Sequence, residues 1–168
     1  MLVQSYMVRI TVCVVTLLLL TGCGTAMHPS LNSAEQFWPS TEPVKNAKKY
    51  FRNGNFGLAE KHYRLAVEKT PRSAEAWLGL AASYDQLRRF DLADKAYTSA
   101  RQLVGDRPSI LNNIGYSYIL RSDLEKAKHK LLEAFNKDPD NPHIMNNIEI
   151  LNQSLIENGR AVVVVKKS

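Results

Sequence analysis

Cysteine is scarce in this chain, and both cysteines lie near its start. Cys13 and Cys23 are the only ones among the 168 residues, and they lie inside or beside the first apolar run. The rest of the chain is therefore expected to hold neither a disulfide nor a cysteine-based zinc site. The four histidines stand at positions 28, 62, 129 and 143, without companions at the spacing of metal ligands. The sequence predicts no metal and no cofactor.

The chain also lacks blocks of one charge and the motifs of common enzyme classes. Its net charge of +6 comes from 22 basic and 16 acidic residues that are interspersed, and no basic stripe carries the aromatics typical of nucleic-acid binding. HExxH, GxSxG, P-loop and GxGxxG patterns are absent. We therefore expect a protein that is not an enzyme and that binds neither nucleic acid nor a small-molecule substrate. An enzyme whose site no motif marks is the alternative.

A hydrophobic run long enough to span a membrane is missing too. The first apolar stretch, ITVCVVTLLLL, covers residues 10–20 and follows Arg9. A membrane-spanning helix needs about 20 such residues. A short apolar run after a positive charge is typical of the core of a signal peptide. The stretch thus predicts export rather than a membrane-spanning helix.

The residues that follow this run form a recognisable sequence. Leu20, Thr21, Gly22 and Cys23 resemble the lipobox of bacterial lipoproteins. The resemblance implies that residues 1–22 are a cleaved signal peptide and that Cys23 carries a covalent lipid. In such lipoproteins Asp after the cysteine favours the inner membrane, and Gly24 stands there instead. We expect an outer-membrane lipoprotein facing the periplasm; an ordinary secretory signal or an uncleaved anchor is the alternative.

A short tether is expected behind the lipid. Residues 23–39 are mostly small and polar, and a flexible segment of that length spans roughly 20–25 Å. Phe37 and Trp38 are exceptions. They are expected either to pack on the first folded unit or to lie at the lipid interface.

The remainder of the chain repeats with a period of 34 residues, which divides it into units 40–73, 74–107 and 108–141. The pattern resembles the tetratricopeptide repeat (TPR), in which each unit is a pair of antiparallel helices. Small residues, such as Ala81 and Gly115 opposite Ala93 and Ala127, are expected where paired helices approach. The recurring residues are Ala59, Tyr63 and Ala66, then Trp77, Leu80, Ala81, Tyr84, Ala93, Tyr97 and Ala100, then Leu111, Ile114, Gly115, Tyr118, Ala127, Leu131 and Ala134.

An all-α TPR solenoid of three helix-turn-helix repeats with a C-terminal capping helix is therefore predicted. The capping helix covers residues 142–158, with Asn141 as N-cap and Pro142 as its first residue. Ser122 to Glu125 reads as a capping box that opens the second helix of the third unit. Residues 159–168 are expected to be a frayed tail. The alternative is that this β-prone segment pairs with the sheet edge of a partner.

The first helices of TPR units line a groove, which the repeat positions place on particular residues. Side-chain amides there can bind the backbone of an extended peptide, and Tyr116 is the preferred anchor; a helix surface without a ligand is the alternative. A clamp for a C-terminal carboxylate is not expected, because its Lys, Asn and Arg positions hold other residues here. The candidate groove residues are Lys48, Phe51, Leu78, Asp85, Asn112, Asn113, Tyr116, Ile119, Asn146 and Asn147.

One family combines these features. The run ILNNIGYSYILRSDLEKAKHKLLEAFNKDPDNPHIMNNI, residues 110–148, resembles TadD-type lipoproteins of the Tad (Flp) pilus assembly system, and the resemblance covers about residues 53–152. It implies a membrane-anchored adaptor with a pilotin-like role, whose protein partners are a secretin or other pilus and secretion components. A TPR lipoprotein for another envelope process is the alternative, such as type IV pilus biogenesis, outer-membrane barrel assembly or cell-wall enzyme recruitment.

Overall fold

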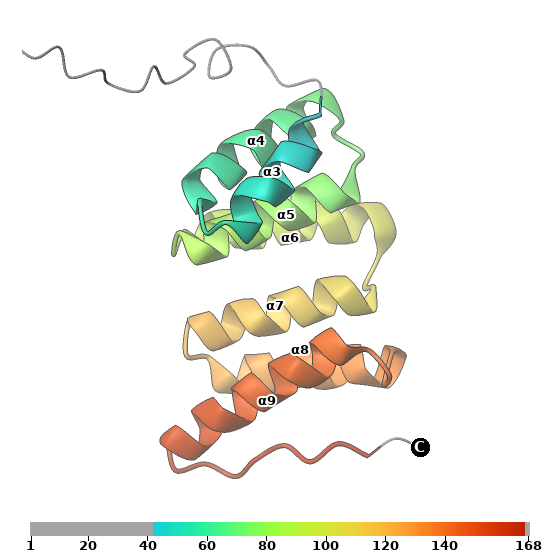
Figure 1. The fold of residues 1–168 in the computed structure, drawn as a ribbon. Coiled ribbons are helices and arrows are strands. Elements are labelled where there is room, and N and C mark those ends of the chain that lie inside the picture. Colours follow the sequence, from blue (N-terminus) through green and yellow to red (C-terminus); the bar gives the residue numbers. More distant parts are fainter. Residues whose placement is uncertain (1–41, 167–168) are drawn as a thin grey trace, which may run out of the picture. The chain divides into compact units, whose positions relative to one another are not determined.

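Seven helices follow one another in the part of the chain that the computed structural model describes, residues 42–166 (Figure 1). No strand occurs among these residues, and the predicted all-α fold is confirmed. The helices are α3 (Pro43–Arg52), α4 (Phe56–Lys69), α5 (Ala74–Gln86), α6 (Phe90–Val104), α7 (Pro108–Leu120), α8 (Leu124–Lys137) and α9 (Pro142–Glu157).

Local sequence signals set where these helices begin. The predicted cap of α9 is confirmed: Pro142 is its first residue, and the Asn141 side chain accepts a hydrogen bond from the backbone at the start of the helix. The cap of α8 is Asp123 and not Ser122, because Ser122 has a φ of 61°, outside the extended region that an N-cap residue adopts. The Asp123 carboxylate accepts from the Lys126 backbone N–H at 3.3 Å.

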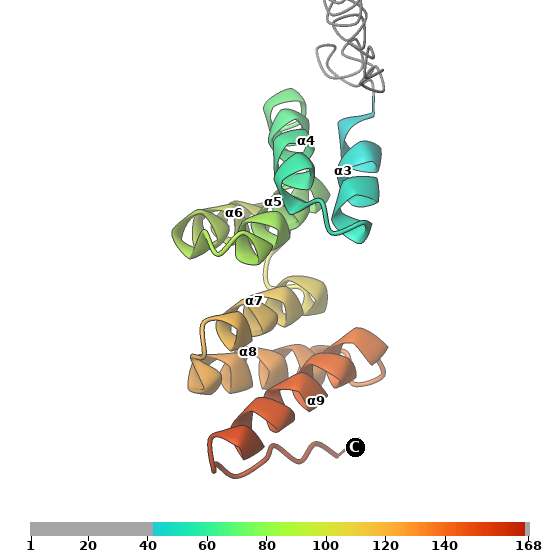
Figure 2. The same cartoon turned by 60° about the vertical axis from the view of Figure 1, so that its left-hand side comes forward.

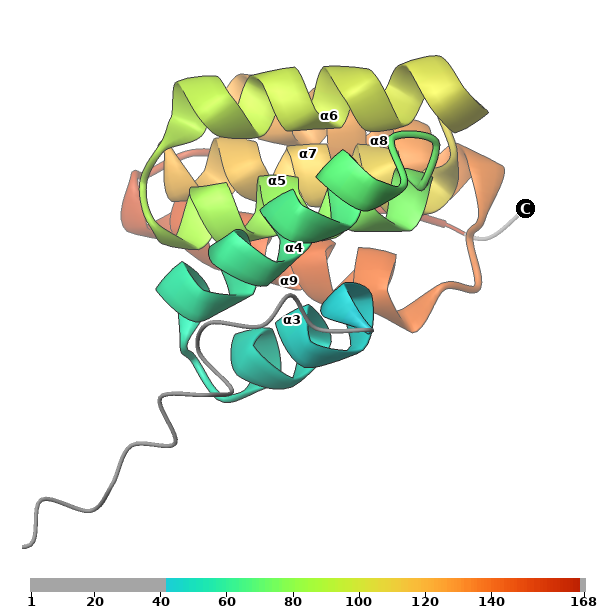
Figure 3. The same ribbon diagram turned by 90° about the horizontal axis from the view of Figure 1, so that it is seen from above.

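The helices pair into three hairpins, α3–α4, α5–α6 and α7–α8, with α9 against both α7 and α8. The hairpins stack in chain order, as Figures 1 and 2 show. Seen from above, α6 and α8 lie towards one side of the stack and α3 and α9 towards the other (Figure 3). The first helix of each unit also contacts the first helix of the next. This arrangement places α5, α7 and α9 beside one another.

The core is built from the recurring residues. The alanines among them are buried at the helix contacts, together with Tyr63, Tyr84, Tyr97 and Leu131. Trp77 and Tyr118 are only partly buried, although Tyr118 was expected in the core. The Tyr118 ring instead carries the Arg121 guanidinium on its face, 5.1 Å from the ring centre.

Two glycines allow helices to approach more closely than any side chain would permit. A Cβ atom at Gly115 would lie 2.6 Å from Cγ of Leu131, so the partner of this glycine is Leu131 and not the expected Ala127. A Cβ atom at Gly79 would overlap the ring of Tyr63. Gly115 thus sets the spacing of α7 and α8, and Gly79 that of α4 and α5.

A buried carboxylate joins the second unit to the third. Asp85 of α5 is only 1% exposed, and it accepts hydrogen bonds from the Tyr97 hydroxyl of α6 at 2.7 Å and from the Ser117 hydroxyl of α7 at 2.6 Å. An Arg121 nitrogen lies 4.0 Å from the same carboxylate and donates to Ser117 Oγ at 2.8 Å. Arg121 also forms a two-pronged ion pair with Asp94 of α6.

Burial governs the protonation of this cluster. It raises the pKa of the Asp85 carboxyl above its ordinary value, against the opposing effect of the hydrogen bonds from Ser117 and Tyr97. Burial and the neighbouring Asp85 charge raise the pKa of the Tyr97 hydroxyl well above its usual range. Tyr97 therefore remains a hydrogen-bond donor at neutral pH.

A frayed tail was expected, but residues 160–166 do not fray. It runs back along α9 on the side away from α7 (Figure 1). Asn152 of α9 hydrogen-bonds both the backbone N–H and the backbone C=O of Val163. Val163 itself joins the core around α8 and α9, and Val165 packs against it. The tail thus covers part of the last helix.

We predict that Gly115→Ala destabilises the fold by about 1–3 kcal/mol, because the added methyl group must displace buried Leu131. The measurement is the free energy of unfolding in urea. Gly57→Ala is the matched control, since Gly57 is exposed in α4 and has open space around it. There the better helix propensity of alanine raises stability by up to about 1 kcal/mol. Equal stability of the two variants would contradict the role of Gly115.

We predict that Asp85→Ala costs about 1–3 kcal/mol of stability, because two buried hydroxyl groups lose their acceptor. Asp85→Asn costs less, since its amide oxygen still accepts one hydrogen bond. Urea unfolding of the three proteins measures both differences.

The Asp85→Asn variant also tests the raised pKa. A carboxyl whose folded pKa lies above its unfolded value of about 3.9 contributes most stability below that value, and this contribution falls as the pH rises through the folded pKa. The stability of the wild type relative to Asp85→Asn is therefore expected to fall as the pH rises above about 4. A relative stability that rises over this range would show that the pKa is lowered instead.

Candidate functional site

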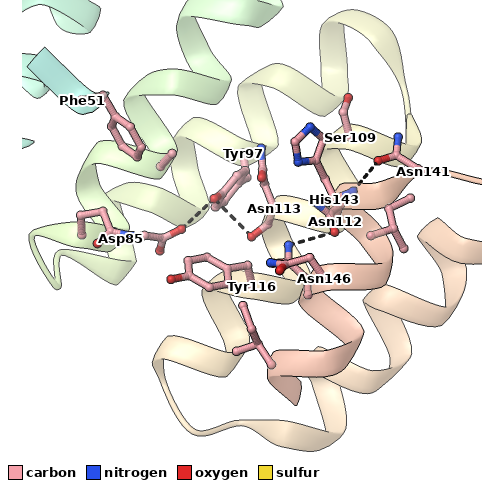
Figure 4. Close-up of a pocket in the computed structure, with 15 residues that line it drawn as sticks. Phe51, Asp85, Tyr97, Ser109, Asn112, Asn113, Tyr116, Asn141, His143 and Asn146 are labelled. Carbon is pink, nitrogen blue, oxygen red and sulfur yellow. Dashed lines mark hydrogen bonds between the residues drawn. The ribbon is translucent and has the colours of Figure 1, made fainter. Parts of the chain in front are cut away.

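A groove of about 560 Å³ runs across α5, α7 and α9, with Phe51 of α3 at one end (Figure 4). The groove arises because the first helices of successive units stack side by side and each of them contributes one face to it. The lining residues are Phe51, Ala82, Asp85, Gln86, Tyr97, Ser109, Asn112, Asn113, Tyr116, Asn141, His143, Ile144, Asn146, Asn147 and Ile150.

The structure brings most of the candidate residues together in this groove. Three lie elsewhere: Lys48 forms an ion pair with Glu75 beside a separate hollow at the start of α3, while Leu78 and Ile119 are partly buried against the core. The candidates that line the groove are Phe51, Asp85, Asn112, Asn113, Tyr116, Asn146 and Asn147.

Four of the five asparagines that line the groove divide into two roles. Asn112 is 6% exposed, and its carbonyl oxygen accepts a hydrogen bond from the Asn147 amide at 3.0 Å. This pair links α7 to α9, so its members are already engaged. The side-chain amides of Asn113 and Asn146 make no hydrogen bond within the described residues, and Asn146 is exposed. These two amides are available to a ligand.

Asp85 and Tyr97 line the groove but are held in the buried cluster. Figure 4 shows their hydroxyl–carboxylate contact next to Asn113, whose backbone carbonyl also accepts from Tyr97 at 3.4 Å. Asp85 was expected to face a ligand, but its carboxylate oxygens are occupied from within the protein. Its role is to position the groove walls.

Sequence reasoning missed the contribution of α9 to the apolar part of the groove. Ile144 and Ile150 line it, as does His143. Applying the repeat positions to α9 would have identified His143 and Ile150, which stand where the first helix of a further unit would present groove residues.

No Lys or Arg side chain lines the groove. The one carboxylate in its lining, that of Asp85, is buried and hydrogen-bonded. What remains for a ligand is a set of apolar surfaces, from Phe51, Tyr116 and Ile150, beside neutral amides. Such a surface suits an uncharged extended peptide, whose backbone the amides can bind through both donor and acceptor groups.

In residues 42–166, no cluster of three or more His, Cys, Asp or Glu side chains lies in a position to hold a metal ion. No helix in this part of the chain is both long and apolar enough to cross a membrane. The lipobox residues Leu20 to Cys23, the proposed tether and Phe37 and Trp38 fall outside the described residues.

Comparison with known proteins finds similarity to a pilus assembly protein. No family model matches the sequence. The type IV pilus assembly protein PilF of Pseudomonas aeruginosa is 26% identical over 153 residues, which cover 89% of this chain and 61% of PilF. The chain thus spans about three fifths of the length of that relative.

Solved structures show the same repeat architecture. The structure of P. aeruginosa PilF matches with a TM-score of 0.60 and 27% identity, over 70% of this chain and 53% of that one. The first TPR domain of RPAP3, bound to the HSP90 peptide SRMEEVD, matches with a TM-score of 0.58 and 21% identity, over 68% of this chain and 90% of that one. The chain is an all-helical TPR-repeat protein that is similar to PilF.

Proposed function

We propose that this protein is a non-enzymatic scaffold for pilus assembly, which holds an uncharged extended segment of a protein partner in the groove of α5, α7 and α9. The observation that carries the proposal is the groove itself, which Tyr116 and the unpaired amides of Asn113 and Asn146 line together. The likeness to PilF supports the assignment to pilus assembly.

The chemistry of the groove narrows the class of ligand. The peptide bound to RPAP3 ends in Glu-Glu-Val-Asp, and such an acidic end calls for cations. Here Lys48 is paired with Glu75, and no Lys or Arg lines the groove. An acidic C-terminus would lose its hydration without gaining a partner charge. The proposed ligand is therefore an internal, neutral segment with an apolar side chain over Tyr116.

Anchoring completes the proposal. A lipid on Cys23 would hold the scaffold and its partner at the outer membrane, and acyl chains contribute about 0.8 kcal/mol for each buried CH₂ group. The role is then pilotin-like, on a secretin or a related component. The resemblance of residues 53–152 to TadD-type proteins favours the Tad (Flp) system, whereas the likeness to PilF favours type IV pili. These are the two systems to be separated.

We predict that a photo-crosslinking amino acid at Tyr116 captures a component of the pilus machinery in intact cells. The residue lines the groove, so a bound segment lies within reach of its side chain. Mass spectrometry of the adduct identifies the partner, and the partner's identity separates the Tad system from type IV pili. The same amino acid at Leu58, a 39% exposed side chain of α4 that does not line the groove, is the control.

Adducts restricted to proteins outside pilus assembly would contradict the function, and equal adducts from Leu58 would contradict the site. Once the partner is known, Tyr116→Ala is expected to weaken binding by about 2 kcal/mol, the loss typical of an aromatic anchor. Leu58→Ala leaves the affinity unchanged.

We predict that Cys23→Ser moves the protein from the membrane fraction to the soluble periplasmic fraction and reduces surface pili. Its helical circular dichroism is expected to match that of the wild type, because the substitution lies outside the helices of residues 43–157. Cys13→Ser is the matched control and leaves the protein in the membrane fraction. If Cys23→Ser stayed in the membrane and supported normal piliation, lipid anchoring would be the wrong mechanism.

A further inference from the structure

The C-terminal tail is ordered by a side chain that imitates a neighbouring strand. Asn152 donates from its amide nitrogen to the Val163 carbonyl at 2.9 Å and accepts from the Val163 N–H at 2.7 Å. This is the pair of hydrogen bonds that one residue of an adjacent strand would provide. Val163 is 8% exposed, so its side chain is anchored in the core as well.

Burial alternates along the tail with the period of a strand. Val163 and Val165 pack inward, whereas Val162 is 45% exposed and Val164 is 76% exposed. In an extended chain, successive residues direct their N–H and C=O groups to opposite edges. Because Val163 directs its pair to Asn152, Val162 and Val164 direct theirs away from α9. Within the described residues these backbone groups have no hydrogen-bond partner.

We propose that this free edge is a docking strand, which pairs with an extended segment of a partner protein that is apolar at its centre and acidic where it meets Lys166. The site is separate from the groove and goes beyond the proposed scaffold function. An extended backbone is the occupant that offers hydrogen-bonding groups at the matching period. A helix satisfies its own backbone groups and would leave the edge unpaired.

The charges at the two ends of the tail determine which charge the partner segment should carry. Lys166 is exposed and forms no ion pair within the described residues, while Arg160 is already paired with Glu125 of α8. An acidic residue beside Lys166 is therefore favoured. A second copy of the tail fits less well, because full antiparallel overlap would place Lys166 of one copy opposite Arg160 of the other.

The contacts that hold the tail against α9 reduce the conformational entropy that the tail loses on binding a partner. An isolated six-residue strand would lose conformational entropy on pairing, but this one is already held by Asn152 and by two inward valines. The exposed side chains of Val162 and Val164 then add apolar contact with the partner strand.

We predict that the peptide acetyl-Glu-Thr-Val-Thr-Val-amide binds the tail of the full-length protein. Antiparallel pairing brings its glutamate to Lys166. Hydrogen exchange followed by NMR should show slower exchange of the Val162 and Val164 amides when the peptide is added. The Val163 amide, already bonded to Asn152, serves as the internal reference. A matched peptide with lysine in place of glutamate should bind more weakly.

Val164→Pro removes one edge N–H and keeps the extended conformation that Val163 needs, so peptide affinity should fall about ten-fold through the lost hydrogen bond. Tyr116→Ala should bind the peptide as the wild type does, which separates this proposal from the groove. Several results would overturn the docking strand: unchanged exchange at Val162 and Val164 under excess peptide, equal affinity of Val164→Pro, or peptide-induced shifts confined to the groove. A dimer in sedimentation that Val164→Pro dissociates would assign the edge to a second copy instead.

Discussion

The buried carboxylate of Asp85 is the contact on which both the stack and the groove depend. It accepts hydrogen bonds from hydroxyl groups of α6 and α7. One side chain therefore joins the two helices of the second unit and also joins that unit to the third. Asp85 and Ser117 belong to α5 and α7, which are two of the helices that form the walls of the groove. A protein that builds a binding surface between units needs such a contact, because each unit buries its apolar face only against its neighbours.

Asparagine amides hold parts of this molecule together in two places. Asn112 and Asn147 bond one another between α7 and α9, and Asn152 binds the backbone of the tail through both of its polar atoms. The second case displays within the protein the interaction proposed for Asn113 and Asn146 in the groove. An amide can bind any extended backbone in this way, whatever its side chains, so specificity must come from neighbouring apolar contacts and charge.

Much of the fold could be predicted because its determinants are local or periodic. The 34-residue period located the hairpins, and Asn141 with Pro142 marked the start of α9. Errors arose where the outcome depends on conformation: Ser122 takes a left-handed φ and leaves the cap to Asp123. Gly115 meets Leu131 because the side chain that fills the space above a glycine depends on how the two helices are rotated.

Sequence alone determined the helices and their order, since these follow from repeat spacing and from the residues that begin helices. It also placed seven of the ten candidate residues in the groove. Tertiary structure decided which polar groups remain free. Asp85 is hydrogen-bonded to Tyr97 and Ser117, and Asn112 to Asn147. The side-chain amides of Asn113 and Asn146 stay unpaired. It also decided that the valine-rich tail is held against α9. The physical reason is that hydrogen bonding between distant residues depends on how whole helices are placed, which no short stretch of sequence encodes.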